Sequence, residues 1–339
     1  MRSSEFRLAA TIATVTLAFF VVDFFYFPRS SVILDSYNWF ELAKVMIVLA
    51  AITAAMMLVE WRIEKDRSRV GRLIAASAAA VRSLANNAFL FVPMSFASVW
   101  FMYLASATDR PLMDQTLAAL DAAIGFDWRA FLDLMNSQSI VAGALVFAYH
   151  ALGRQIPLLL IFLGFTQRPR LTEFIALLAI SGALTGALMW FVPAAGAYAY
   201  FHPQLTDFGN FTARAGMWHF TELMRIRSGE PFDLVVTRAE GLVTFPSYHT
   251  ALGIMIVYAL RDYRWLFWFV GCLNAVMIVS TLPEGGHHLI DVIAGVVVAV
   301  ASIVAVRAIA SYDRGEAHAA PAVSQLTEGH GVQAKNCEG

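Results

Sequence analysis

Long apolar runs occupy most of the chain and predict its secondary structure. Eight of them lie near 8–27, 41–60, 84–106, 139–166, 171–192, 246–261, 264–281 and 287–311. A helix of about 20 apolar residues crosses a bilayer core of roughly 30 Å, and in lipid a helix bonds its own backbone polar groups. The pattern predicts an all-α polytopic membrane helix bundle with about eight transmembrane spans. Pro157 lies inside the fourth run, where it can kink the helix.

The segment 111–135 has a different pattern, because its apolar positions fall on one helical face. The other face carries four carboxylates: Asp114, Asp121, Asp127 and Asp133. Amphipathic helices of this kind lie along a membrane surface. We therefore expect this segment to form helices at the interface that do not cross the bilayer.

The composition agrees with a membrane protein. Of the 339 residues, 59% are hydrophobic and 14% are charged, whereas soluble domains carry about 25% charged residues. The formal net charge of −1 says nothing about a nucleic-acid partner, and no basic patch suggests one, so no nucleic acid is expected. Cys272 lies in an apolar run and Cys337 near the C-terminus, so the cysteines form neither a disulfide framework nor a zinc-binding spacing.

The domain organisation follows from the same pattern. We expect residues 1–311 to form a single integral membrane domain. Residues 312–339 contain few large apolar side chains, which predicts a disordered cytoplasmic tail.

Basic residues predict how the bundle is oriented. They concentrate in the loops after the second, fourth and sixth runs: Arg62, Lys65, Arg67, Arg69, Arg72 and Arg82, then Arg168 and Arg170, then Arg261 and Arg264. Loops rich in lysine and arginine stay in the cytoplasm. The chain is therefore predicted to be a multi-pass protein of a bacterial inner membrane, with both termini cytoplasmic and the loop 193–245 outside.

Ionisable residues stand at the start of the last apolar run, where residues 286–291 read Gly-His-His-Leu-Ile-Asp. His287 and Asp291 are four residues apart, so they share one face of a helix. The carboxylate can fix the imidazole tautomer and leave the other ring nitrogen as a nucleophile or base. Free amides at a helix start also favour a phosphate group. The spacing alone fits a structural His–Asp pair equally well.

A second polar stretch begins the sixth run, where residues 245–250 read Phe-Pro-Ser-Tyr-His-Thr. Ser247 is placed to cap the helix, and that position needs no function. His249 then falls in the first turn, at the same membrane face as His287. Two imidazoles at one site can divide the work, because one attacks while the other protonates the leaving group. Together the two stretches predict phosphoryl transfer at the outer face.

These stretches resemble the second and third signature motifs of the type 2 phosphatidic acid phosphatase superfamily, in the same order. Phe-Pro-Ser-x-His-Thr, followed by His-His-x-x-Asp-Val-x-x-Gly, is most similar to the inositol phosphorylceramide synthase-like branch, which contains inositolphosphotransferases of sphingolipid metabolism. The resemblance covers roughly residues 140–310. It implies a six-span catalytic core, with its motifs within 185–295.

The resemblance also implies roles for the residues. His287 would be the nucleophile that forms a phosphohistidine, Asp291 would orient it, and His249 would be the general acid. Ser247 and nearby amides would bind phosphate oxygens. Neither a metal ion nor another cofactor is implied.

The sequence departs from the superfamily in its cations. Thr185 and Val192 occupy the positions of the basic residues of the first motif, and Thr281 stands where the third motif usually has an arginine. A phosphoryl transition state spreads negative charge over its oxygens and normally needs cations nearby. The usual cationic clamp is therefore absent.

Other arginines are candidates to replace the clamp. The outer loop holds Arg214, Arg225, Arg227 and Arg238. We favour Arg227 and, less strongly, Arg225, although arginines at an interface can also bind lipid headgroups. Arg154 is a third candidate, because a charge within an apolar run indicates function. It could instead pair with Asp291 or Glu173.

Three functions fit these observations. The first is a membrane phosphotransferase that moves a phospho-headgroup between lipids. The second is a lipid phosphate phosphatase, in which water accepts the phosphoryl group at the same residues. The third is a non-catalytic lipid-binding or transport protein, against which the intact His249, His287 and Asp291 argue. The substrate is expected to be a lipid phosphate or phospholipid that reaches the site from the bilayer, and the resemblance favours transfer.

Overall fold

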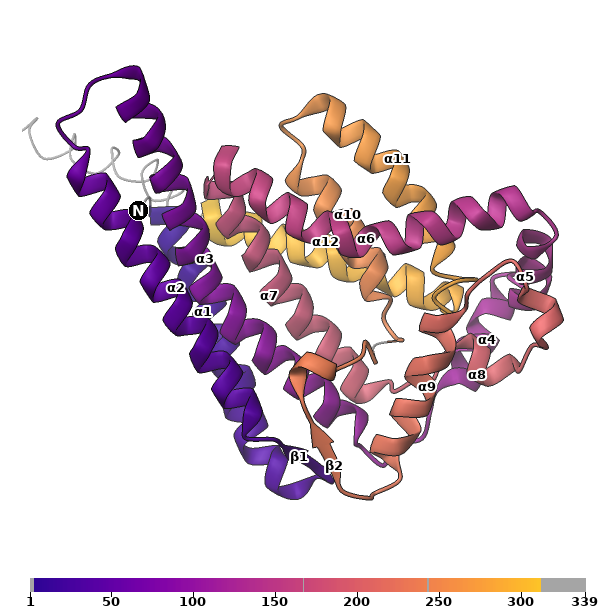
Figure 1. The fold of residues 1–339 in the computed structure, drawn as a ribbon. Coiled ribbons are helices and arrows are strands. Elements are labelled where there is room, and N and C mark those ends of the chain that lie inside the picture. Colours follow the sequence, from indigo (N-terminus) through magenta and orange to yellow (C-terminus); the bar gives the residue numbers. More distant parts are fainter. Residues whose placement is uncertain (1–2, 167, 243, 312–339) are drawn as a thin grey trace, which may run out of the picture.

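The computed structural model describes residues 3–166, 168–242 and 244–311, which form a bundle of helices (Figure 1). The long helices are α1 (Ser3–Tyr26), α2 (Tyr37–Arg62), α3 (Arg69–Ser106), α6 (Ser139–Thr166), α7 (Arg168–Phe191) and α12 (Leu289–Ser311). The shorter ones are α4 (Asp114–Ala123), α5 (Trp128–Asn136), α8 (Ala197–Phe201), α9 (Arg214–Arg227), α10 (Tyr248–Ala259) and α11 (Arg264–Ser280). The expected all-α polytopic bundle is confirmed. The tail 312–339 lies outside the described residues.

Six helices of the described chain are long and apolar enough to cross a membrane: α1, α2, α3, α6, α7 and α12. The expected spans near 246–261 and 264–281 correspond to α10 and α11, which have 12 and 17 residues. At 1.5 Å per residue, α10 is about 18 Å long, shorter than a bilayer core of roughly 30 Å. A count of eight full spans therefore stays a prediction.

Helix α7 lies at the centre of the bundle. In its most apolar stretch, 61% of the residues are buried within the protein, against 0% for the peripheral α2. Small residues let neighbouring helices approach α7 closely: Ala176 and Ala179 are fully buried, and a Cβ at Gly186 would lie 2.7 Å from the ring of Phe101. The helices α1, α6, α7, α10, α11 and α12 form one contiguous packed set.

The segment between α7 and α10 folds across one end of the bundle. Its strand β2 (Phe232–Leu234) pairs in parallel with β1 (Val32–Leu34), which follows α1. This pair lies at the opposite end of the molecule from the α2–α3 turn (Figure 1). Trp100 and Tyr103 of α3 pack beneath it in a separate hydrophobic cluster.

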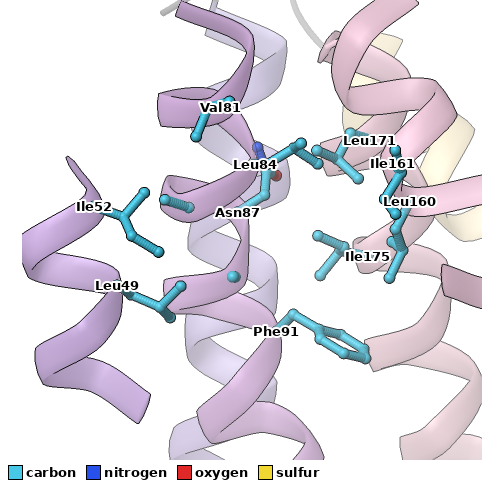
Figure 2. A pocket seen from close by; sticks show the side chains of 12 residues that line it. Leu49, Ile52, Val81, Leu84, Asn87, Phe91, Leu160, Ile161, Leu171 and Ile175 are labelled. Atoms are coloured by element: carbon cyan, nitrogen blue, oxygen red, sulfur yellow. The ribbon is translucent and has the colours of Figure 1, made fainter. Parts of the chain in front are cut away.

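An apolar hollow of about 290 Å³ lies between α2, α3, α6 and α7 (Figure 2). Leu49, Leu84 and Phe91 are among its aliphatic and aromatic lining side chains. Asn87 is its one polar lining residue, and the amide oxygen of Asn87 accepts a hydrogen bond from Thr172 at 2.9 Å. The hollow is a feature of the apolar bundle, away from the polar motifs.

The segment 111–135 forms the short helices α4 and α5, but its acidic face is not uniformly solvated. Asp133 is exposed, and Asp127 caps α5 by accepting a hydrogen bond from the Ala130 amide at 3.0 Å. Asp114 and Asp121 are only 6% and 2% exposed. Backbone amides of other segments meet these two carboxylates, which is why they are buried although they lie on the polar face of the segment.

A close approach between α10 and α12 sets their spacing. A Cβ at Gly295 would collide with the Ser247 carbonyl oxygen and lie 2.9 Å from the Cβ of Thr250. We expect Gly295→Ala to destabilise the protein by about 1–3 kcal/mol, because backbone leaves little room to relax. Thermal unfolding in detergent measures this. Gly143→Ala, at an open position on α6, should instead leave stability unchanged or raise it, and equal effects of the two would refute the packing argument.

Candidate functional site

His287 and Asp291 meet at the start of α12. Nδ1 of His287 lies 3.4 Å from Oδ2 of Asp291, and the two residues are 2% and 0% exposed. The backbone amide of His288 donates to the same Oδ2 at 2.9 Å. The carboxylate thus contacts one ring nitrogen of His287 and leaves Nε2 for chemistry.

His249 lies in the first turn of α10, beside His287. The centroids of the two imidazole rings are 6.2 Å apart. Tyr149 of α6 also stacks on His249, with centroids 4.8 Å apart and planes tilted by 19°. Packing therefore holds His249 close to His287.

Ser247 joins α10 to α12 through its backbone. Its amide donates to the carbonyl of Asp291 at 2.9 Å. Its hydroxyl accepts hydrogen bonds from the amide and the hydroxyl of Thr250, at 3.4 and 3.1 Å. Ser247 is fully buried. The structure therefore places its hydroxyl in the helix cap and not on a pocket surface.

Two glycines shape the turn that leads to His287. Gly286 has a φ of +70°, a conformation that favours glycine, and its carbonyl accepts from the amide of Ala197 at 2.8 Å. A Cβ at Gly285 would lie 2.9 Å from the Tyr149 ring and 3.2 Å from the His287 ring. The turn can thus pass close to both rings.

A pocket of about 400 Å³ opens in front of the two imidazoles. It is lined by α6, α9, the segment before α10 and the turn before α12: Tyr149, His150, Arg214, Trp218, His219, Glu240, Gly241, Thr244, His249, Gly285 and His287. Its wall combines imidazoles, one guanidinium and aromatic rings. Such a wall can bind a phosphate group and present a nucleophile and an acid to it.

Arg214 is the arginine of this pocket. It is exposed at the first residue of α9, and its guanidinium lies over the Trp218 ring at 4.1 Å. Arg214 is one of the four arginines of the outer loop, although the sequence favours Arg227 and Arg225 for the clamp. Arg214 and Trp218 are four residues apart, a spacing that places both on one face of a helix and is visible in the sequence.

The preferred arginines of the outer loop lie elsewhere. The Arg227 guanidinium donates to the carbonyl of Ser106 at 3.5 Å and to that of Arg110. Arg225 pairs with Glu222 at 3.4 Å. Neither residue lines the pocket of the two imidazoles.

Arg154 is exposed on α6 and does not line this pocket. The two carboxylates expected as alternative partners of Arg154 contact other residues. Glu173 pairs with Arg170 at 2.7 Å and with Arg261 at 2.6 Å, and Asp291 contacts His287.

Glu284 is a fully buried carboxylate that fixes the start of α9. It accepts hydrogen bonds from the amides of Thr212 and Ala213 at 3.0 and 3.4 Å, and from the Thr212 hydroxyl. Its Oε1 lies 3.2 Å from Nε2 of His150. Because these bonds end one residue before Arg214, Glu284 positions that arginine next to the turn of His287.

Asp121 and Asp114 of α4 hydrogen-bond to backbone amides on either side of the site. Asp121 accepts from the amides of Leu289 and Ile290 at 3.0 and 2.8 Å, and so caps α12. Asp114 accepts from the amide of Gly196 at 2.7 Å. The two aspartates of the amphipathic segment thus hold the backbone on both sides of the site.

His288 lies between these two carboxylates, just before α12. Its ring nitrogens are 3.5 Å from Asp121 and 3.7 Å from Asp114. Burial alone would lower the pKa of His288, but the two carboxylates raise it from 6.5 to about 9. The imidazole is therefore positively charged at neutral pH and links the two aspartates.

A comparison with protein-family models matches residues 115–305 to the PAP2 superfamily. This interval begins in α4 and ends in α12. It includes His249, His287, Arg214 and Glu284. No match was found among curated proteins or among solved structures.

Alkaline pH should remove the stabilisation that His288 provides. Its folded-state pKa of about 9 exceeds the unfolded value of 6.5, so the contribution is complete below pH 6.5 and is lost as the pH rises through about 9. We expect the unfolding temperature of the wild type in detergent to fall over this interval, and that of His288→Gln to start lower and fall less. His202→Gln, at an exposed position, should follow the wild type. If the unfolding temperature of His288→Gln has the same pH dependence as that of the wild type, the ion pairs of His288 with Asp114 and Asp121 do not stabilise the fold.

Proposed function

This chain belongs to the PAP2 superfamily, and from that premise we propose that it is a membrane lipid phosphotransferase that works through a phosphohistidine on His287. The superfamily has a phosphatase-like lipid phosphoesterase fold, and the apolar helices indicate a multi-pass membrane protein. One observation carries the proposal: His249 and His287 line the same pocket, and Asp291 stands behind His287.

In the first half-reaction, Nε2 of His287 attacks the phosphorus of a lipid phosphate. The new P–N bond forms as the bond from phosphorus to the leaving oxygen breaks. His249 donates a proton to that oxygen, so the lipid leaves as a neutral alcohol. Asp291 stabilises the positive charge that develops on the His287 ring.

Arg214 supplies positive charge to the phosphoryl oxygens. The superfamily positions of the basic residues hold Thr185, Val192 and Thr281 here, and Thr185 and Thr281 are fully buried. Arg214 lines the pocket, and the bonds of Glu284 hold the chain just before it. It therefore suits the role better than Arg227, whose guanidinium is bonded to carbonyls of the chain after α3.

In the second half-reaction, the hydroxyl of another lipid attacks the phosphorus of the phosphohistidine, and the P–N bond to His287 breaks. His249, which gave up its proton in the first step, takes the hydroxyl proton, and the acceptor leaves with the phosphoryl or phospho-headgroup. The likeness of both motifs to the inositol phosphorylceramide synthase-like branch supports transfer. A lipid phosphate phosphatase would use the same residues with water as the acceptor, and the family match supports that chemistry as well. The paired imidazoles argue against a lipid-binding or transport protein without chemistry.

The site is proposed to face outward from a bacterial inner membrane, with both termini cytoplasmic. The basic α2–α3 turn lies at the opposite end of the molecule from β1, β2 and the segment over the site (Figure 1). Basic loops remain in the cytoplasm. This arrangement supports an outer site that lipids enter from the bilayer.

Product analysis of purified protein tests the proposal. With an acceptor alcohol, a lipid phosphate donor should give a new phosphomonoester of that alcohol and a phospholipid donor a new phosphodiester, and neither product should form without the acceptor. His287→Gln should lose turnover by orders of magnitude, and His249→Gln should lose about 10²–10⁴-fold. His202→Gln is the control. Phosphate release regardless of acceptor would favour the phosphatase, and full turnover in His287→Gln would exclude the covalent mechanism.

The role of Arg214 has its own test. We expect Arg214→Gln to lower kcat by about 10²–10³-fold, because one donor to a developing anion is removed. Arg214→Lys should restore part of the rate. Arg29→Gln removes an exposed cation from the short helical turn after α1, outside the pocket, and should leave the rate unchanged. Equal rates for Arg214→Gln and the wild type would show that the clamp lies elsewhere.

A further inference from the structure

Two further imidazoles line the same pocket, those of His150 and His219, and neither has a part in the two half-reactions. His150 of α6 adjoins Tyr149, with ring centroids 5.5 Å apart and planes at 87°. Tyr149 in turn stacks on His249, which adjoins His287. The four rings therefore form a continuous series of contacts along the pocket, from His150 through Tyr149 and His249 to His287.

His150 bridges the open pocket and a buried charge. Its side chain is 47% exposed, whereas Glu284, 3.2 Å from its Nε2, is 0% exposed. Glu284 is held in place by the amides of Thr212 and Ala213. A carboxylate behind an imidazole fixes the ring and supplies a counter-charge for its protonated form, as Asp291 does for His287.

The charge balance of the pocket leaves room for another cation. A transferring phosphoryl group carries negative charge on three oxygens. Among the described lining residues, Arg214 is the only arginine and there is no lysine, while Glu240 adds a negative charge. His287 and His249 are committed to the nucleophilic and acid steps. Two lining imidazoles remain, His150 and His219. His219 is 6% exposed and its Nε2 lies 2.8 Å from the Ala195 carbonyl oxygen, whereas the side chain of His150 is 47% exposed, so His150 is the one that can present positive charge to the pocket.

We infer that His150, held by Glu284, donates a hydrogen bond to a phosphoryl oxygen and completes with Arg214 the clamp that replaces the missing basic motif. This inference rests on the proposed function. It assigns binding and transition-state stabilisation to His150, and no covalent step. It also gives α6 a direct role in the site, through a residue outside both histidine motifs.

Substitutions at His150 separate this role from a structural one. His150→Gln keeps a donor for Glu284 but cannot carry charge, whereas His150→Arg restores the charge. The measurements are inhibition by inorganic phosphate and by orthovanadate, which mimics the transition state, together with kcat, KM and the unfolding temperature.

We expect His150→Gln to weaken orthovanadate binding by about 10- to 100-fold, as for loss of a charged hydrogen bond, and to lower kcat with it. Its unfolding temperature should stay close to that of the wild type. His150→Arg should recover most of both losses, and His202→Gln should change neither.

Two results would overturn the inference. One is wild-type orthovanadate affinity in His150→Gln, and the other is a failure of His150→Arg to recover affinity although it folds with wild-type stability. The proposed function fails separately, if the wild type forms no phosphoprotein on His287 with any lipid phosphate that it turns over.

Discussion

The structure depends on the cost of burying carboxylates around a single turn. Four of them surround the start of α12: Asp114, Asp121, Glu284 and Asp291. A buried carboxylate is costly unless hydrogen bonds or opposite charges compensate it. Here the compensating groups are imidazoles and the backbone amides of distant segments. Satisfying these oxygens brings α4, the start of α9 and α6 to the same turn, and α6, α9 and this turn contribute to the lining of the pocket.

This constraint also explains why the site is divided between charged and uncharged groups. Asp291 and Glu284 each stand behind an imidazole, so negative charge lies in the protein wall and the ring edges face the pocket. Arg214 follows the chain segment that Glu284 holds. The imidazoles and Arg214 are thus positioned by Asp291 and Glu284, the buried carboxylates that lie behind them.

Local sequence patterns predicted the contacts between residues that are close together in the chain. The i, i+4 spacing placed His287 beside Asp291, and the Pro-Ser start of α10 indicated the cap at Ser247. The apolar periodicity of 111–135 predicted helices, but it cannot show whether a polar face meets water or amides, so the burial of Asp121 was missed. The position of Arg214 depends on how the segment 193–245 folds back, and helix periodicity carries no information on that path.

The parallel pairing of β1 with β2 connects the family-matched region to the helices that precede it. The family match begins at residue 115, yet the segment that carries Arg214 is tied to the chain before it. Strand β1 pairs with β2, the Tyr103 hydroxyl accepts from the Glu240 amide at 2.8 Å, and Arg227 binds the carbonyl of Ser106. The first three helices therefore hold part of the family-matched region in place, and we expect that region not to fold correctly when it is transplanted without them.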